Sequence, residues 1–554
     1  MRRVVVGSVL SGSLIAAQAL LTNEAHAGGF ELSGVGTRGM GRAGANAASV
    51  DDSLALALNP ALLADIDSQV ALNAHLVVWD ACVQRSGTYG NPDGTGMSGD
   101  YAGGASIFGD DGNGTPSPYA GTAFPRVCNS GAPQIVPQIM ANVRLTEDVG
   151  IGFGIIAPNG VGSARFGGDD GTVTANGMRL PTPTRYMVAA EDLLLFFPSI
   201  GVGYRPFDWL SVGLTLQWGV GIISFTNYVN PGSGASIPGT ISEDPSSDIR
   251  ARFNVTDAFV PAGILSLHFT PHDNLDIMVS GRISDSIGGV VQATGDINVT
   301  TGVYGTGSDL SYVPTQSTIS GASLQAGQPF QFTLGARYAD RVRPRRDVNG
   351  HRHADSLHDE NWDIELNLVY EQLSQVQDFV VSSPAGSSTT LQPGGGAAPV
   401  VVPLPNPIPL PHGWSDLLTM RLGGDVNDIP DQFALRAGVS FELPVDQRYR
   451  RYASNDFIAG WRFGAHVGAS LRVDSFDFSL AYGFFLGETV NNTGVANLRQ
   501  VNALGSSGTC AGTPTGQPVA QSGCYPNGFG SVVNGGIFSQ MFHAVSLGAT
   551  YRFN

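Results

Sequence analysis

Residues 475–486 read SFDFSLAYGFFL, and this stretch decides the fold class. Its apolar side chains recur at every second position, and the positions between them hold serine, aspartate, alanine or glycine as far as residue 483. The apolar set comprises Phe476, Phe478, Leu480, Tyr482, Phe484 and Leu486. Since successive side chains of a β-strand point to opposite faces, period two predicts a strand with one wholly apolar face.

The same alternation recurs elsewhere in the chain. Residues 432–443 and 461–472 show it clearly, and the last such stretch holds Val545, Leu547, Ala549, Tyr551 and Phe553. An aromatic residue beside the C-terminus resembles the recognition signal of outer-membrane barrels. Alternation alone is also typical of a soluble sandwich, so strand faces do not decide between the two architectures.

Connection lengths do decide between them. Fourteen candidate strands begin near residues 68, 134, 149, 185, 208, 250, 275, 329, 361, 414, 431, 457, 475 and 538. Tight turns at 146–148, 206–207, 271–274 and 473–474 alternate with long connections rich in glycine, proline and serine at 81–133, 159–184, 301–328, 383–413 and 490–537. An even number of strands with short turns at one end and long loops at the other predicts an all-β, 14-stranded antiparallel transmembrane barrel.

The composition agrees with this class and excludes others. Of 554 residues, 42% are hydrophobic and only 14% charged, against about 25% charged in average chains. A net charge of −17 argues against nucleic acid as a partner. All 29 basic residues are arginine, which excludes a lysine-dependent phosphate loop or Schiff-base enzyme. We find no catalytic set at usable spacing, and we expect neither enzymatic activity nor a cofactor.

The N-terminus has the three parts of a secretory signal peptide. A basic Met1-Arg2-Arg3 start is followed by an apolar run and by the small-x-small site Ala25-His26-Ala27. We therefore expect residues 1–27 to be removed on export, and a mature chain beginning near Gly28. No other run of ~18 apolar residues predicts a second α-helical span.

Four cysteines suit an exported protein. Pairing of sequence neighbours predicts the disulfides Cys82–Cys128 and Cys510–Cys524, and three pairings are possible in all. No CxxC spacing indicates a thiolate metal site. Residues 344–360 (PRRDVNGHRHADSLHDE) are a long charged connection on the short-turn side, where a solvated turn and a metal site built on His351, His353 and His358 are the alternatives.

Residues 28–67 precede the first strand and do not alternate. Residues 51–64 (DDSLALALNPALLA) predict a short helix, which Asn59-Pro60 ends or bends. The lumen of a 14-stranded barrel is wide enough to need filling. We therefore expect residues 28–67 to form a plug inside a barrel made by residues 68–554.

At this point the sequence resembles the FadL family, the outer-membrane transporters of long-chain fatty acids and aromatic hydrocarbons. Residues 28–66 look like the family's N-terminal hatch, and weaker similarity continues at 197–206, 414–416 and 431–439. The hatch resemblance rests on Gly39, Gly41, Arg42, Ala43, Asp51, Asp52, Asn59, Pro60 and Ala61.

The resemblance implies a mechanism. In the family a hydrophobic ligand enters from outside, the hatch plugs the barrel, and a kink in the third strand opens the wall for lateral release into the bilayer. Here the third strand holds Gly150, Gly152, Gly154 and Pro158, and glycine inside a strand marks bends or bulges.

Family members that take fatty acids place basic side chains near the outer ends of the fifth and ninth strands. The corresponding residues 219–230 and 371–382 contain no arginine, which favours an uncharged ligand. By alternation Arg282, Arg436 and Arg462 face the lumen, where they either meet a ligand head group or pair with Asp363, Glu365 or Glu442.

The sequence as a whole predicts an outer-membrane channel of a Gram-negative bacterium for passive uptake of hydrophobic molecules. The expected surroundings are the lipid bilayer, lipopolysaccharide and the outer-membrane assembly machinery, with the chain as a monomer. A general porin for polar solutes and a surface-adhesion barrel acting through its loops are the alternatives.

Overall fold

The computed structural model describes most of residues 35–553. The gaps within that range are residues 90–121, 158–162, 230–247, 285–289, 305–311, 346–353, 377, 394–395, 397, 405, 430, 452–453, 457, 494–495 and 501–529. The signal peptide, the first residues of the hatch, Pro158, Cys510 and Cys524 lie outside the described residues.

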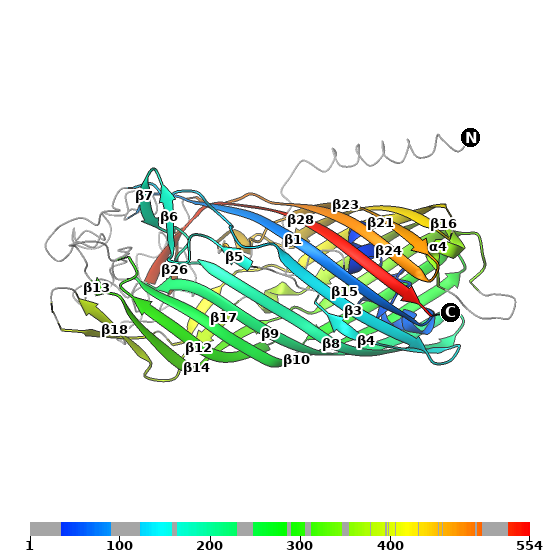
Figure 1. The fold of residues 1–554 in the computed structure, drawn as a ribbon, viewed down its shortest axis with the longest axis horizontal. Coiled ribbons are helices and arrows are strands. Elements are labelled where there is room, and N and C mark those ends of the chain that lie inside the picture. Colours follow the sequence, from blue (N-terminus) through cyan, green and yellow to red (C-terminus); the bar gives the residue numbers. More distant parts are fainter. Residues whose placement is uncertain are drawn as a thin grey trace.

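Fourteen antiparallel strands of the described chain form a closed barrel, as predicted (Figure 1). The first and last strands close it, with Gln69 opposite Arg552 and Arg85 opposite Gly536. The strands are β1 (Gln69–Arg85), β3 (Gln134–Arg144), β4 (Val149–Ile156), β8 (Ala190–Phe207), β9 (Leu210–Val229), β10 (Ile249–His272), β11 (Leu275–Ser284), β15 (Gln331–Arg341), β16 (Glu360–Glu371), β21 (Leu417–Ile429), β22 (Phe433–Pro444), β23 (Arg462–Val473), β24 (Phe476–Gly487) and β28 (Gly536–Arg552).

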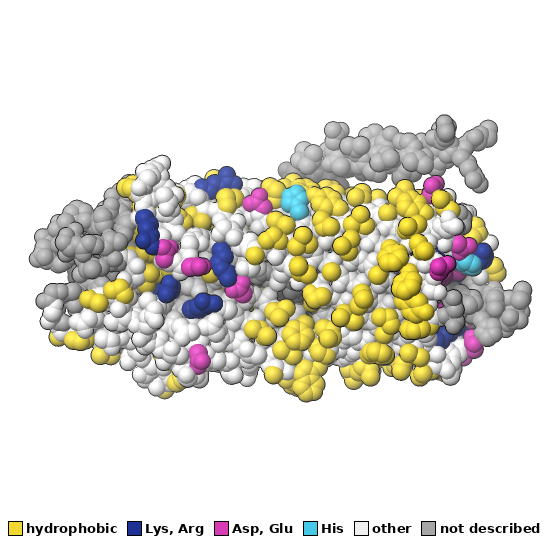
Figure 2. Space-filling view, in the orientation of Figure 1, with side chains coloured by type: hydrophobic (Ala, Val, Ile, Leu, Met, Phe, Trp, Pro, Cys, Tyr) yellow, Lys and Arg dark blue, Asp and Glu magenta, His cyan; other side chains and the backbone are white. Residues whose placement is uncertain are grey.

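The apolar face of the alternating strands points outward. On β24, Leu480 is 54% exposed whereas its neighbour Ala481 is 1% exposed. Outward apolar side chains of the barrel strands form a belt, and Figure 2 shows the part of it on the face in view as a yellow zone. We call this zone the apolar belt. Such a zone matches the apolar band of membrane barrels, which is about 25 Å tall.

The barrel wall continues beyond the apolar belt at the end with the long connections. There β12 (Val290–Thr301) pairs with β10 and β14 (Thr315–Gly327), and β17 (Asp378–Ser382) pairs with β14 and β20 (Ile408–Pro411). The long connections predicted at 301–328 and 383–413 therefore contain strands, with β14 in the first and β20 in the second. The outward positions of β12 and β14 are polar, as at the cross-strand pair Asn298 and Thr318, so these two strands lack the lipid-facing signature.

Short elements complete the described fold. The strands among them are β2 (Val127–Cys128), β5 (Ser163–Arg165), β6 (Thr172–Ala175), β7 (Met178–Pro181), β13 (Tyr312–Val313), β18 (Ser388–Pro393), β19 (Val400–Pro403), β25 (Val490–Asn491), β26 (Ala496–Gln500) and β27 (Gly530–Asn534). The helices outside the hatch are α4 (Ser356–Asp359), η6 (Leu373–Gln375) and η8 (Arg448–Arg451). No helix in the described part is both long and apolar enough to cross a membrane.

The described hatch residues, 35–67, lie inside the barrel near the short-turn end, where Figure 1 shows them in blue. They form α2 (Gly36–Gly41), α3 (Ala55–Leu58) and η1 (Pro60–Ala64). The helix expected over 51–64 is thus two short turns separated at Asn59. Pro60 accounts for the break, because proline disfavours helical backbone in the residue before it.

Cys82 of β1 and Cys128 of β2 are joined by a disulfide and also lie opposite each other in the sheet. The bridge therefore joins two strands at the long-connection end, and not two loops.

The outward face of β24 generates a stability prediction. Leu480→Arg places a charge in the apolar belt and should lower the free energy of unfolding by about 2–4 kcal/mol. Gln316→Arg adds the same group on the exposed outer part of β14 and should change stability little. Equilibrium unfolding in phospholipid vesicles measures both. Equal losses for the two variants would contradict the assignment of the belt to lipid.

Candidate functional site

A buried arginine joins the hatch to the barrel wall. Arg42, which follows α2, is fully buried and donates from both terminal nitrogens to the carboxylate of Asp363 on β16, each at 2.8 Å. It also donates to Asp425 on β21 at 2.7 Å and to the carbonyl of Ala45 at 2.8 Å. A guanidinium fork matches a carboxylate in two places at once, so these contacts fix both the position and the orientation of this part of the hatch.

Two wall glycines allow this approach. Gly423 on β21 and Gly438 on β22 face the backbone of Arg42, and a Cβ at either position would overlap that backbone. The predicted hatch residue Gly41 is also tightly enclosed, since a Cβ there would lie 2.7 Å from the side chain of Arg436. The hatch backbone thus packs directly on the wall with no side chain between them.

The Asn59-Pro60-Ala61 turn is held from two sides. The amide nitrogen of Asn59 donates to the carbonyl of Ala47 at 2.9 Å and lies 3.2 Å from Nδ1 of His268 on β10. The backbone N–H of Ala61 donates to Oγ of Ser266 at 2.9 Å, also on β10. These hydrogen bonds place the turn against the strand that carries the next part of the site.

The pKa values of the two hatch aspartates, Asp51 and Asp52, are shifted in opposite directions. Burial opposes ionisation of Asp51, but its ion pair with Arg38 outweighs burial, and Ser356 donates to it from N at 2.9 Å and from Oγ at 2.6 Å. The pKa of Asp51 is therefore well below its usual range. Burial, followed by the neighbouring charge of Asp51, raises the pKa of Asp52 to about 6.

Ser356 begins α4, within the charged connection 344–360. The described part of this connection is attached to the rest of the molecule, whereas a fully solvated turn was one of the expected alternatives. Asp355 pairs with Arg472 of β23 at 2.7 Å, and Arg345 pairs with Asp276 of β11 at 2.6 Å. His351 and His353 lie outside the described residues, so the metal site stays a prediction.

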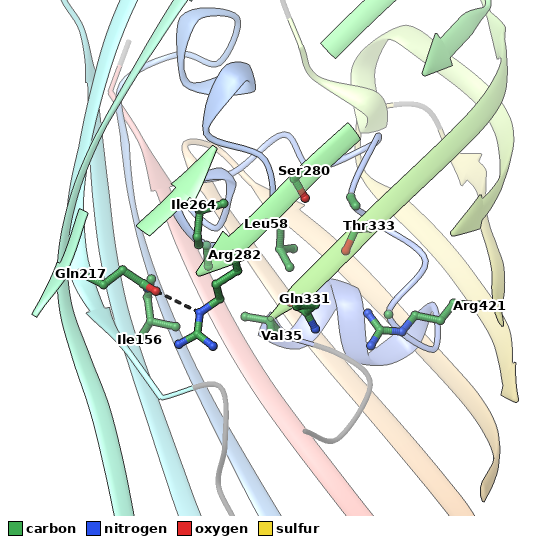
Figure 3. A pocket seen from close by; sticks show the side chains of 13 residues that line it. Val35, Leu58, Ile156, Gln217, Ile264, Ser280, Arg282, Gln331, Thr333 and Arg421 are labelled. Atoms are coloured by element: carbon green, nitrogen blue, oxygen red, sulfur yellow. Dashed lines mark hydrogen bonds between the residues drawn. The ribbon is translucent and has the colours of Figure 1, made fainter. Parts of the chain in front are cut away.

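A small cavity of about 50 Å³ lies between the hatch and the wall. Its apolar lining comes from hatch residues and from Ile156 and Ile264 of the wall (Figure 3). The wall also contributes polar groups from β9, β11, β15 and β21. Its labelled polar residues are Gln217, Ser280, Arg282, Gln331, Thr333 and Arg421.

Of the three arginines predicted to face the lumen, only Arg282 lines this cavity. Its Nε donates to Oε1 of Gln217 at 3.1 Å, and its guanidinium lies 4.8 Å from the centre of the Phe197 ring. Arg462 pairs with Glu442 at 2.7 Å, one of the pairings predicted from the sequence. Arg436 approaches Asp425 at 3.5 Å, a partner that sequence reasoning did not name.

Arg421 also lines the cavity and was missed. It lies on β21 at an inward position between the outward-facing Met420 and Leu422. Among the described residues its buried Nε has no hydrogen-bond partner. The alternation of β21 was sufficient to place this side chain in the lumen, but nothing in the sequence indicated that it would have no acidic partner.

An apolar interior continues outward from the cavity. Phe197, against which Arg282 packs, belongs to a buried cluster contributed by β8, β9, β10, β12 and the outer strands. Within it the rings of Phe225 and Phe253 stack with centres 4.4 Å apart. Further members are Leu195, Val255, Ile297, Leu324, Val381 and Leu410. The inner surface of this part of the barrel is therefore apolar, which is unusual for a channel that passes ions.

Among the described residues, the wall is incompletely paired beside the cavity. β3 and β4 pair only as far as Ile139 opposite Ile155, so residues 134–138 pair with β1 alone among the described strands. On the far side, β8 pairs with β4 up to Phe197 and with β5 from Asp192. Residues 193–196 thus have a described strand partner only in β9, and a single side-chain hydrogen bond of 3.5 Å, from Nε2 of Gln134 on β3 to the carbonyl of Leu193, crosses the gap. We call this interrupted section of the wall the β3–β8 window.

The predicted gate glycines lie on β4, the strand that borders this window, and two of them face the hatch. A Cβ at Gly150 would overlap the carbonyl of Leu63, and one at Gly152 would lie 3.0 Å from the Leu63 side chain. Gly154 faces Met140 of β3, where a Cβ would lie 2.6 Å from the side chain. The hatch therefore contacts the strand that borders the window.

Residues 18–184, which include the hatch and the first three barrel strands, match the family model described as outer membrane protein transport protein (OMPP1/FadL/TodX). The match agrees with the plugged 14-stranded barrel. Over these residues the chain is similar to the FadL/TodX family. A comparison with curated proteins finds no match.

Solved structures of FadL/TodX-type proteins share the fold. A Pseudomonas aeruginosa FadL homologue superposes with a TM-score of 0.64 at 17% identity, covering 95% of this chain and 100% of that one. The Pseudomonas putida toluene transporter TodX gives 0.54 at 14% identity, with 95% and 100% covered. The Ralstonia pickettii toluene transporter TbuX gives 0.52 at 14% identity, with the same coverage.

The opposite pKa shifts of Asp51 and Asp52 predict that substitutions at these positions change stability in a pH-dependent way. Because the folded-state pKa of Asp52 is raised, its contribution to stability is present in acid and is lost as the pH rises through about 6. Asp52→Asn should therefore stabilise the protein by ~1–2 kcal/mol at pH 7.5, with the gain shrinking towards pH 4. Thermal unfolding in detergent at the two pH values measures this.

Asp51→Asn is the matched control and should have the opposite sign. Its lowered pKa contributes stability above the unfolded-state value near 3.8, which the amide removes at pH 7.5. If both variants shifted the unfolding temperature in the same direction at pH 7.5, the electrostatic account of the hatch would be wrong.

Proposed function

We propose that the chain is a passive outer-membrane channel that takes up hydrophobic molecules from outside and releases them sideways into the bilayer. The observation that carries the proposal is the continuity of an apolar interior with a cavity at the hatch and a window in the wall beside it. Similarity to the FadL/TodX family supports the transport class, and two of the similar solved structures are toluene transporters.

The three parts follow one another in space. The outer apolar cluster reaches Phe197, Phe197 packs on Arg282, and Arg282 lines the cavity. Ile156, another cavity residue, is the last residue of β4 and borders the β3–β8 window. An apolar molecule gains about 0.8 kcal/mol for each methylene removed from water, so transfer along this route into lipid is favourable.

The cavity supports a more specific ligand class, an apolar molecule with an anionic end. Its hatch side offers Val35, Ala47 and Leu58, whereas Arg282 and Arg421 approach from the wall. The buried Nε of Arg421 lacks a hydrogen-bond partner among the described residues, and a carboxylate is the group that a guanidinium best accommodates. This revises the expectation of an uncharged ligand, which rested on residues 219–230 and 371–382.

The volume of about 50 Å³ holds little more than water, so a long ligand requires the hatch to shift. We propose that this shift moves Leu63 away from β4 and connects the cavity with the window. A general porin for polar solutes is disfavoured because the hatch fills the lumen. A surface-adhesion barrel is disfavoured because binding through the outer loops does not require an apolar interior.

Uptake measurements test the transport function and the ligand class together. In cells lacking the chain, restored expression should restore uptake of labelled oleate, n-octane and toluene. Arg421→Gln removes a charged hydrogen bond, worth roughly 1.5–3 kcal/mol, and should reduce oleate uptake about tenfold or more while leaving the two hydrocarbons unaffected.

Thr333→Val is the control for a change in the cavity wall that carries no charge. Uptake of all three compounds at the same rate with and without the chain would refute the transport function. Restored uptake with no selective loss in Arg421→Gln would leave transport intact and refute the carboxylate site.

Lateral release has its own test at the window. Ala157, 7% exposed, directly follows β4, and Ala157→Trp should obstruct the window. We expect uptake to fall to the level of cells lacking the chain, while purified protein still binds ligand. Ala469→Trp adds the same bulk on the outward face of β23 and should leave uptake unchanged. Normal uptake by Ala157→Trp would exclude this exit.

A further inference from the structure

A second, larger concavity lies on the outer surface of the barrel. Its volume is about 620 Å³, and it occupies the outward face of β8, β9, β10, β12 and β14 beyond the apolar belt. Residues 165–171 border it beside the sheet. We call it the outer groove. Its lining is polar, and the groups that matter below are Arg165, Asp169, Asp192, Arg250, Arg252 and Asn298.

The basic groups of the groove differ in what they already contact. Arg165 pairs with Asp192 at 2.5 Å, and Arg250 donates to the carbonyl of Asp169 at 3.1 Å and to Oγ1 of Thr300 at 3.3 Å. Arg252 is exposed and makes no hydrogen bond or ion pair with any described residue. In a chain of net charge −17, this leaves an available cation where two arginines lie two residues apart on one face of β10.

Hydroxyl and amide groups surround this cation. Arg252 lies between Thr226 of β9 and Asn298 of β12, and Thr318 of β14 donates to Oδ1 of Asn298 at 2.9 Å. Ser224, Thr300, Gln316 and Ser317 complete the polar lining. Such donors and acceptors suit a sugar, and a guanidinium suits a phosphate.

The distance of the groove from the apolar belt indicates which ligands can reach it. The outermost apolar side chains on this face are Leu194 and Ile222, which pair across β8 and β9 and are 46% exposed. Thr226, opposite Arg252, is four residues further along β9, or about 13 Å along the strand. Figure 2 shows basic side chains grouped in this polar zone directly beside the belt. Lipid head groups of the outer leaflet occupy this level.

The groove is separate from the transport route. Ala251 and Phe253, the neighbours of Arg252 in β10, point inward and are buried in the apolar cluster of the lumen. One wall therefore presents apolar groups to the interior and a polar, basic concavity to the outside. A ligand in the groove contacts the outer surface only.

We propose that the outer groove binds the phosphorylated sugar head group of lipopolysaccharide in the surrounding outer leaflet. Arg252 and Arg250 contact a phosphate of the head group, and the hydroxyl and amide groups contact its sugar. A free phosphate ion has the same charge chemistry. The volume of the groove, its sugar-compatible lining and its position beside the belt favour the lipid.

Binding of purified lipopolysaccharide to the full chain in detergent micelles tests the proposal. Arg252→Gln should weaken binding about tenfold, and Arg250→Gln with Arg252→Gln should weaken it further, because each change removes a charge-assisted contact. Arg126→Gln removes an exposed arginine outside the groove and should bind as the wild type does. Arg252→Lys keeps the charge and should retain part of the affinity. All variants should keep wild-type uptake of n-octane.

Two competitors identify the source of the phosphate. Inorganic phosphate at millimolar concentration should not displace lipopolysaccharide, and micelles containing phosphatidylglycerol should displace it only weakly. Displacement by inorganic phosphate at micromolar concentration would make the groove a free-anion site and overturn the proposal. So would unchanged lipopolysaccharide binding by the Arg250/Arg252 double variant. Because Arg252 is exposed, a folding defect in Arg252→Gln is not expected, and the folded fraction is checked by thermal unfolding.

Discussion

The buried contact of Arg42 with Asp363 and Asp425 is the interaction on which the rest of the site depends. It joins the hatch to β16 and β21 in a region from which water is excluded. Removing one member of such a group leaves an uncompensated charge, which typically costs 3–5 kcal/mol. The cavity, the contact with β4 and the Asn59 turn all depend on a hatch held in this one position.

The network extends past Arg42 in both directions. Arg337 of β15 contacts Asp363 at 2.6 Å, and also Asp276 at 3.3 Å. Arg38 of the hatch approaches Asp425 at 3.3 Å and pairs with Asp51. Charges of both signs alternate through the base of the lumen, whereas the apolar cluster around Phe197 lies farther out. Several of the acidic residues that give the chain its net negative charge lie in this network.

Much of the fold could be predicted from the sequence because lipid imposes a strict pattern. Outward positions in the belt must be apolar, so strands such as β22, β23 and β24 were recognised with their faces correctly assigned. β12, β14, β17 and β20 lie beyond the belt, where the outward positions need not be apolar, and those of β12 and β14 are polar. Their alternation is weaker, and connection length alone did not reveal them.

The site was less predictable than the fold. Alternation placed Arg282, Arg436 and Arg462 in the lumen, but their partners come from strands distant in sequence, as Asp425 does for Arg436. Arg421 occupied an equivalent position without being noticed. Whether a given arginine forms an ion pair with a carboxylate depends on residues that are close in space but distant in sequence. The alternation within one strand does not identify those residues. For the same reason the proximity of Arg250 and Arg252 to polar groups on β9, β12 and β14 was not foreseen.

The length of β10 has a consequence for how scarce solutes are captured. Its 24 residues extend about 80 Å along the strand, well beyond a belt about 25 Å tall even after allowance for tilt. The mouth of the barrel therefore opens in water, outside the lipid phase. There the concentration of a poorly soluble compound is limited by its aqueous solubility, and the flux is limited by diffusional encounter with a rim of fixed radius. A rim that projects from the membrane can be reached by solute from the sides as well as from above. The rate at which solute molecules meet the rim therefore rises, although the pore is no wider.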